Sequence, residues 1–164
     1  MRAVKKQIEF TEYDTIDQLT PKDQSLLNEA IKISHTAYAP YSNFKVGAAI
    51  LLNNEEVVVG NNQENIAYPS GLCAERVAIF HAGATHPNET VDTIAIYAES
   101  DVMPVDTPIS PCGACRQVIM EYRQKQSTPI RIILKPQQGN IWVFECVTDL
   151  LPFAFDLKGL KKQN

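Results

Sequence analysis

Three of the four cysteines stand in two short motifs that could bind a metal ion. The first motif places Glu75 two residues after Cys73, and the second places Cys115 three residues after Cys112. Thiols three positions apart lie on one face of a helical turn. The positive end of a helix stabilises thiolates, so two such helix starts brought together would favour three thiolates around one zinc ion.

Neither motif contains an obvious fourth protein ligand. Structural zinc sites are closed by four protein ligands, whereas catalytic sites keep one position for water, whose pKa falls to about 7. A carboxylate beside such a water is a candidate proton shuttle, and Glu75 is placed for that role. Arg76, one turn after Cys73, could donate hydrogen bonds to a thiolate, and Arg116 is an equal alternative.

Other interpretations of these cysteines need no catalysis. Cys112 and Cys115 could be a redox pair or half of a structural zinc knuckle. The fourth cysteine, Cys146, is expected to be a small buried hydrophobic residue.

Composition narrows the class of protein. The chain has 164 residues, a mass of 18.3 kDa, a formal net charge of −4 and a pI near 5.4. We therefore expect one domain with little attraction for a nucleic-acid polymer, which needs clustered cations. No signal peptide or membrane span is expected, so the predicted location is the cytoplasm, where a close cysteine pair favours a metal or catalytic site over a disulfide.

Strand and helix signals alternate along the chain. Apolar, β-prone runs predict strands at residues 44–52, 56–59, 93–98, 130–134 and 141–146, with a weak signal at 7–11. Helical patterns cover residues 72–82, with Gly83 as the C-cap, residues 113–124, and a short stretch at 148–151. An earlier helix begins at Thr20 and Pro21 and ends by Pro40. This order predicts one sheet with helices on its faces, and sites at the strand ends where helices begin.

Both cysteine motifs resemble those of the zinc nucleoside deaminases, whose signature is a His or Cys, a Glu two residues on, and Pro-Cys-x-x-Cys. The most similar class is that of the short, homotetrameric cytidine deaminases. The likeness runs from about residue 38 to residue 160 and includes residues 41–44, 62–65 and 150–155.

The resemblance implies a fold and a domain organisation. The fold is an α/β, three-layer α/β/α sandwich with a mixed, mostly five-stranded sheet. Residues 20–164 form a single catalytic domain, and residues 1–19 are an N-terminal extension outside the likeness, with no assigned role.

The resemblance also implies roles for individual residues. Cys73, Cys112 and Cys115 would hold one zinc ion, and Glu75 would move protons. The substrate would be held by Phe44 on the pyrimidine ring, Asn62 and Glu64 on the ribose hydroxyls, and the backbone around Ala74 and Ser110 on the base edge. Tyr68 and Phe155 resemble residues that the family supplies across subunit boundaries, which implies a homotetramer with shared active sites.

The implied reaction is the hydrolytic deamination of cytidine and 2′-deoxycytidine, with release of ammonia, in pyrimidine salvage. One alternative is a deaminase of another aminopyrimidine nucleoside, such as blasticidin S. A second alternative, from another class, is a structural zinc module without turnover. The chain departs from the family pattern at Ile66, where the family usually has Ala, and a bulkier side chain there could alter the pocket or a subunit contact.

Overall fold

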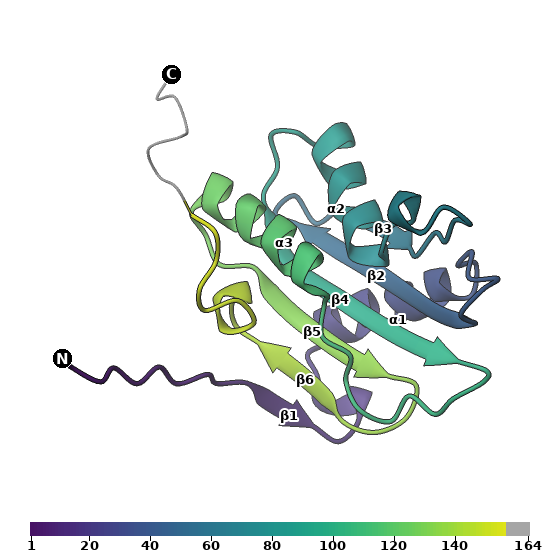
Figure 1. Ribbon diagram of the computed structural model, residues 1–164, viewed down its shortest axis with the longest axis horizontal. Coiled ribbons are helices and arrows are strands. Elements are labelled where there is room, and N and C mark those ends of the chain that lie inside the picture. Colours follow the sequence, from purple (N-terminus) through teal and green to yellow (C-terminus); the bar gives the residue numbers. More distant parts are fainter. Residues whose placement is uncertain (157–164) are drawn as a thin grey trace.

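A mixed sheet of six strands forms the centre of the molecule (Figure 1). The computed structural model describes residues 1–156; the end of the predicted domain, residues 157–164, lies outside the described residues. The strands are β1 (Thr11–Tyr13), β2 (Phe44–Leu52), β3 (Val57–Asn61), β4 (Val91–Ser100), β5 (Arg131–Pro136) and β6 (Ile141–Phe144). Their order is β1-β6-β5-β4-β2-β3, with β4 and β5 parallel and the other described neighbours antiparallel.

Helices cover both faces of this sheet, as an α/β sandwich requires. Helix α1 (Pro21–Ser34) lies on one face, while α2 (Ala74–Thr85) and α3 (Gly113–Gln126) lie on the other (Figure 1). Short 3₁₀ turns occupy Ile16–Gln18, Tyr68–Ser70 and Val147–Asp149. No helix within residues 1–156 is long and apolar enough to span a bilayer.

The predicted α/β class is confirmed, but the expectation of a mostly five-stranded sheet is wrong. The sixth strand is β1, which pairs with the outer edge of β6 through Thr11 opposite Val143 and Tyr13 opposite Ile141. Only Tyr13 of these three strand residues is even partly buried. A strand this short and exposed has no alternating apolar pattern, so its pairing depends on the β6 edge rather than on its own sequence.

Two helix ends differ from the sequence-based expectation. Helix α1 begins as predicted, with the Thr20 hydroxyl accepting from the Asp23 amide at 3.2 Å, but it ends at Ser34, six residues before Pro40. Helix α2 does not end at Gly83; it continues to Thr85. Gly83 lies inside the helix, where the absence of a Cβ leaves room for the Tyr122 hydroxyl of α3.

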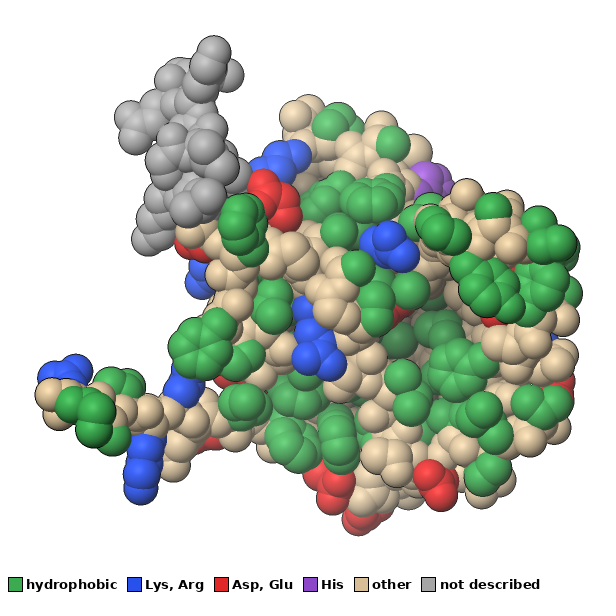
Figure 2. Space-filling view, viewed as in Figure 1, with side chains coloured by type: hydrophobic (Ala, Val, Ile, Leu, Met, Phe, Trp, Pro, Cys, Tyr) green, Lys and Arg blue, Asp and Glu red, His purple; other side chains and the backbone are tan. Residues whose placement is uncertain are grey.

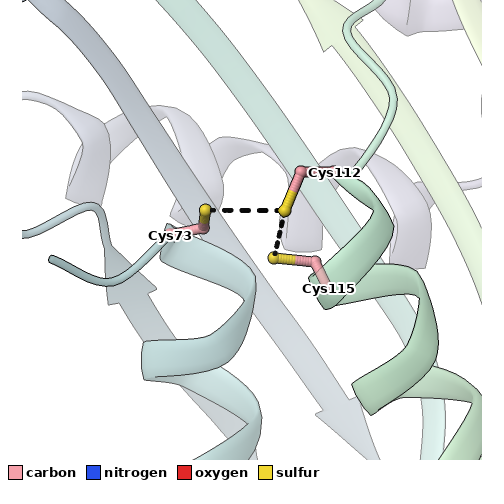
Figure 3. A group of neighbouring side chains, drawn as sticks. All are labelled: Cys73, Cys112 and Cys115. Atoms are coloured by element: carbon pink, nitrogen blue, oxygen red, sulfur yellow. Dashed lines mark hydrogen bonds between the residues drawn. The ribbon is translucent and has the colours of Figure 1, made fainter. Parts of the chain in front are cut away.

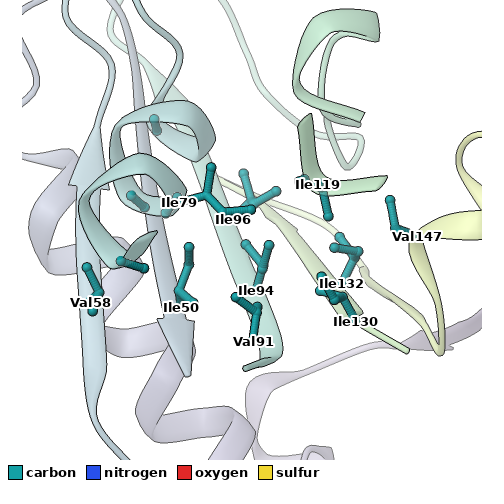
Figure 4. Close-up of a cluster of buried hydrophobic side chains, with 14 of the residues drawn as sticks. Ile50, Val58, Ile79, Val91, Ile94, Ile96, Ile119, Ile130, Ile132 and Val147 are labelled. Atoms are coloured by element: carbon teal, nitrogen blue, oxygen red, sulfur yellow. The ribbon is translucent and has the colours of Figure 1, made fainter. Parts of the chain in front are cut away.

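The core is divided between the two faces by the strict alternation of strand residues. On β2, Ala48, Ile50 and Leu52 face α2 and α3, where they join one large apolar cluster (Figure 4). The intervening residues Ala49 and Leu51 face α1 and join a second cluster. This alternation fixes which side of the sheet carries each helix and therefore brings α2 and α3 together.

Two glycines let the helices approach the sheet closely. A Cβ at Gly47 on β2 would overlap the Ala30 carbonyl oxygen of α1 and come within 2.8 Å of the Ser34 amide nitrogen. A Cβ at Gly60 on β3 would lie 2.9 Å from the Ala78 Cα of α2. In both places the obstacle is helix backbone, which cannot rotate away as a side chain can.

Substitution of Gly47 tests this close packing. Gly47→Ala should lower the free energy of unfolding by about 2 kcal/mol or more, because α1 must move off the sheet. The matched control is Gly113→Ala, where a Cβ meets no atom within 4 Å outside its chain neighbours and its own helix backbone. This control should be neutral or slightly stabilising. Urea unfolding of the two variants measures the difference, and equal stabilities would contradict the packing of α1 on β2.

A candidate metal centre and the cavity beside it

Three thiols from two helices converge on one point. Cys73 is the residue before the first turn of α2, Cys112 is the residue before the first turn of α3, and Cys115 lies within that turn. The sulfur atoms point toward one another (Figure 3), with 3.9 Å between Cys73 and Cys112 and 3.5 Å between Cys112 and Cys115. All three sulfurs lie within 4.8 Å of one another.

This spacing fits one tetrahedral metal ion. With Zn–S bonds of about 2.3 Å, tetrahedral sulfurs lie about 3.8 Å apart, close to the distances between these thiols. Within residues 1–156, no His, Asp or Glu joins the group. A set of three protein ligands leaves a coordination position free for water or substrate, as in catalytic zinc sites.

The thiols perturb one another strongly at this distance. Hydrogen bonding with Cys115 lowers the pKa of Cys73 well below the ordinary thiol range, with a further contribution from Arg76. The same bond, together with burial, raises the pKa of Cys115. Metal ions bind cysteine as the thiolate, so a divalent cation bound at this point would displace the protons that the three sulfurs share.

The structure distinguishes the two arginines that could support a thiolate. An Arg76 guanidinium nitrogen lies 3.9 Å from the Cys73 sulfur. Arg116 instead donates to the carbonyl oxygens of Pro111 at 2.6 Å and Leu150 at 3.1 Å. Arg76 therefore contacts the thiol group directly, whereas Arg116 ties the loop before α3 to the segment after β6.

Glu75 is a buried carboxyl in the first turn of α2, with 5% of its surface exposed. Burial raises its pKa to about 7, and the negative charge of Cys73 adds to the rise. A carboxyl with a pKa near neutrality can both accept and return a proton at that pH.

A cavity of about 480 Å³ opens beside Cys73. Of the residues singled out in the sequence, it is lined by Asn62, Glu64, Tyr68, Cys73 and Arg76. The Asn62 amide is held by β2, because it accepts from the Val46 amide at 2.8 Å and donates to the Phe44 carbonyl at 2.9 Å. An amide retains one further donor and acceptor capacity after two such bonds, so Asn62 can also meet a ligand in the cavity.

Tyr41 and Ser42 also line this cavity. The sequence-based interpretation assigned neither residue a role. The Ser42 hydroxyl donates to the Glu64 carboxylate, which also accepts from the Tyr41 amide at 2.9 Å. These bonds, the Ser42 hydroxyl first, lower the pKa of Glu64. The sequence contains one local indication of this arrangement, a turn-forming Asn43 directly after Ser42. In the structure Asn43 adopts a positive φ of 53°.

The other singled-out residues lie outside the lining of this cavity. Phe44 starts β2 and is half-buried, Ala74 is fully buried at the start of α2, and Ser110 lies half-buried in the loop before α3. Phe155 is 69% exposed and lines a different cavity, beside α3. Ile66 is 82% exposed and does not line the cavity near Cys73.

Lysines and arginines are scattered over the face that carries α2 and α3. Figure 2 shows them mostly apart from one another among hydrophobic and uncharged groups, with no continuous basic stripe on this face. Among the described residues that line the cavity, Arg76 is the one cation, and it is engaged with Cys73. This pattern lacks the basic groove that tracks a single nucleic-acid strand.

Comparisons with known proteins agree with this geometry. Residues 20–128 match the family model described as the cytidine and deoxycytidylate deaminase zinc-binding region. The cytidine deaminase of Halalkalibacterium halodurans is 40% identical over 132 residues, which cover 80% of this chain and 92% of that protein. The crystal structure of the cytidine deaminase from Burkholderia pseudomallei superposes with a TM-score of 0.69 at 41% identity, covering 80% of this chain and 97% of that one. This chain, an α/β protein with a three-cysteine cluster that could bind zinc, therefore belongs to the cytidine and deoxycytidylate deaminase family.

Proposed function

We propose that this protein is a zinc-dependent hydrolase that deaminates cytidine and 2′-deoxycytidine to uridine and 2′-deoxyuridine. The observation that carries the proposal is the convergence of three thiols beside the buried carboxyl of Glu75, whose pKa is raised to about 7. The names of the relatives support cytidine as the substrate. A structural zinc module would need a closed set of four ligands, which the described residues do not supply.

Each residue of the centre has a defined task in this reaction. Cys73, Cys112 and Cys115 would hold zinc, which activates a water molecule as the nucleophile when it is bound. Glu75 accepts a proton from the water that attacks C4 and delivers it to ring nitrogen N3. The same carboxyl then takes the proton of the new C4 hydroxyl and gives it to the leaving amine as the C4–N bond breaks, so ammonia departs and the C4 carbonyl of uridine forms.

Arg76 balances the charge of the ligand set. Three thiolates concentrate negative charge, and the guanidinium near the Cys73 sulfur offsets part of it. This reduces the electron donation to the metal and so supports its ability to acidify water.

The cavity chemistry favours a nucleoside over its monophosphate. Asn62 and Glu64 offer an amide and a carboxylate, which suit the two hydroxyls of a sugar. A phosphate group would be repelled by Glu64, and Arg76 is already engaged with a thiol. We assign Phe44 to the pyrimidine ring and the backbone near Ala74 and Ser110 to the base edge.

The assignment extends to assembly and location. Tyr68 and Phe155 are 76% and 69% exposed in the single chain, which supports their burial against other subunits in a homotetramer with shared active sites. A centre built from free thiols suits the reducing cytoplasm, where we place the protein.

Metal binding can be tested with two cysteine variants. The protein should bind about one zinc ion per chain, and Cys115→Ser should weaken zinc binding by more than about 100-fold, because losing a ligand costs more than altering its neighbours. The matched control, Cys146→Ser, should retain full binding. Competition with a chromophoric chelator measures both, and an equal loss in the two variants would contradict the assigned ligand set.

The proton-transfer role predicts the effect of a neutral isostere at residue 75. Glu75→Gln should lower kcat by about 10²- to 10⁴-fold, because the amide cannot carry the proton between water, ring and leaving group. Zinc content and unfolding midpoint should remain as in the parent protein. Glu29→Gln, on α1 across the sheet, is the control that should retain activity; full activity in Glu75→Gln would exclude the mechanism.

The sugar contact predicts a binding defect rather than a chemical one. Glu64→Gln should raise KM for cytidine about tenfold or more, since hydrogen bonds to charged groups contribute about 1.5–3 kcal/mol, while kcat changes less. The loss of cytosine absorbance measures the rates. Glu56→Gln, which lies in the β2–β3 hairpin and pairs with His86, is the matched control; if both variants share the parent KM, Glu64 does not bind the sugar.

A further inference from the structure

Residues 6–13 make specific contacts although they precede the family match, which begins at residue 20. Strand β1 adds to the free edge of β6, where Glu12 lies opposite Trp142. The Trp142 indole nitrogen donates to the Glu12 carboxylate at 2.6 Å. This cross-strand bond fixes the register of β1, because a slip of one residue would turn Glu12 to the other face.

An aromatic cluster holds the chain just before β1. The Phe10 ring lies 4.8 Å from the Trp142 ring and 5.2 Å from the Phe144 ring, measured between centroids. Phe144 is buried in the main core, so this cluster attaches the N-terminal segment to the body of the protein.

Four residues earlier, Lys6 reaches the segment that follows β6. Its ammonium group donates to the Pro152 carbonyl oxygen at 3.1 Å and lies 5.7 Å from the centre of the Phe153 ring. Both contacts place one cation against two adjacent residues.

The segment of residues 150–156 packs against the core only in part, through Leu150, Leu151 and Ala154. A cavity of about 910 Å³ is lined by both α3 and residues 151–156, and Phe153 and Phe155 are 87% and 69% exposed. Helix α3 ties the two ends, because Arg116 donates to the Leu150 carbonyl and Gln117 bonds to both the amide and the carbonyl of Phe155. Lys6, which lines the same cavity, donates to the middle of the segment at Pro152.

We propose that residues 6–13 form a strap, anchored on β6 by Phe10 and Glu12, that positions residues 150–156 through Lys6. The inference rests on the proposed function, in which Phe155 completes the substrate pocket of a neighbouring subunit. Lys6 is thus a positioning residue: it touches no substrate and sets the placement of Phe155 through Pro152 and Phe153. The strap also covers the edge of β6, which would otherwise present unpaired backbone groups.

Hydrogen exchange of the full-length protein tests the contact. Lys6→Met should speed amide exchange in residues 151–156 by about threefold or more, because local opening becomes easier once the tether is lost. The matched control, Lys5→Met, should exchange like the parent protein. Phe10→Ala, which removes the anchor, should have the same effect as Lys6→Met without adding to it in the double variant. Unchanged exchange in both Lys6→Met and Phe10→Ala would overturn the strap.

Kinetics test whether the contact acts through Phe155. Lys6→Met should raise KM for cytidine about threefold or more with kcat nearly unchanged, and should have no further effect in a Phe155→Ala background. A KM effect of equal size in both backgrounds, or no KM effect, would overturn the positioning role. If the parent protein deaminates neither nucleoside, the proposed function fails, while the exchange experiment still decides the strap.

Discussion

The convergence of two helix N-termini on one point is the constraint on which the rest of this structure depends. Cys73 and Cys112 each stand immediately before a helix, and Cys115 follows within one turn, so three thiols meet within 4.8 Å. Sulfurs this close compete for protons and repel one another once they are ionised. A cation bound between the three thiolates offsets this repulsion, so metal binding would stabilise the fold at this point.

The same geometry prepares the chemistry beside the metal. Because Cys73 precedes α2 directly, Glu75 lies within the first turn, where burial raises its pKa to about 7. The close approach of α2 to β3 over Gly60 holds that turn in place. The segment directly after β3 carries Asn62 and Glu64, so this segment and the start of α2 together line the cavity beside the thiols.

The segment of residues 150–156 at the periphery is held in a different way from the residues around the thiols. Cys115 and Glu75 are buried at the centre, whereas Phe153 and Phe155 are exposed and polar side chains of α3 and Lys6 hold the segment that carries them. In the homotetramer that we propose, Phe155 meets a neighbouring subunit, and contacts such as that of Lys6 would set the position of its segment. The proposed strap would then connect a short exposed strand at the sheet edge to a pocket that it does not touch.

The sequence by itself determined the parts that depend on local spacing. The metal motifs, the Thr20 cap and the apolar runs of β2, β4 and β5 are readable because helix and strand periods are set by neighbouring residues. Only the tertiary structure decided the contacts between distant segments. It paired β1 with β6, kept Gly83 inside α2 against Tyr122, placed Arg76 rather than Arg116 at the thiol, and joined Ser42 to Glu64. Each of these contacts depends on how two segments pack against each other, and the residue pattern within either segment does not determine that packing.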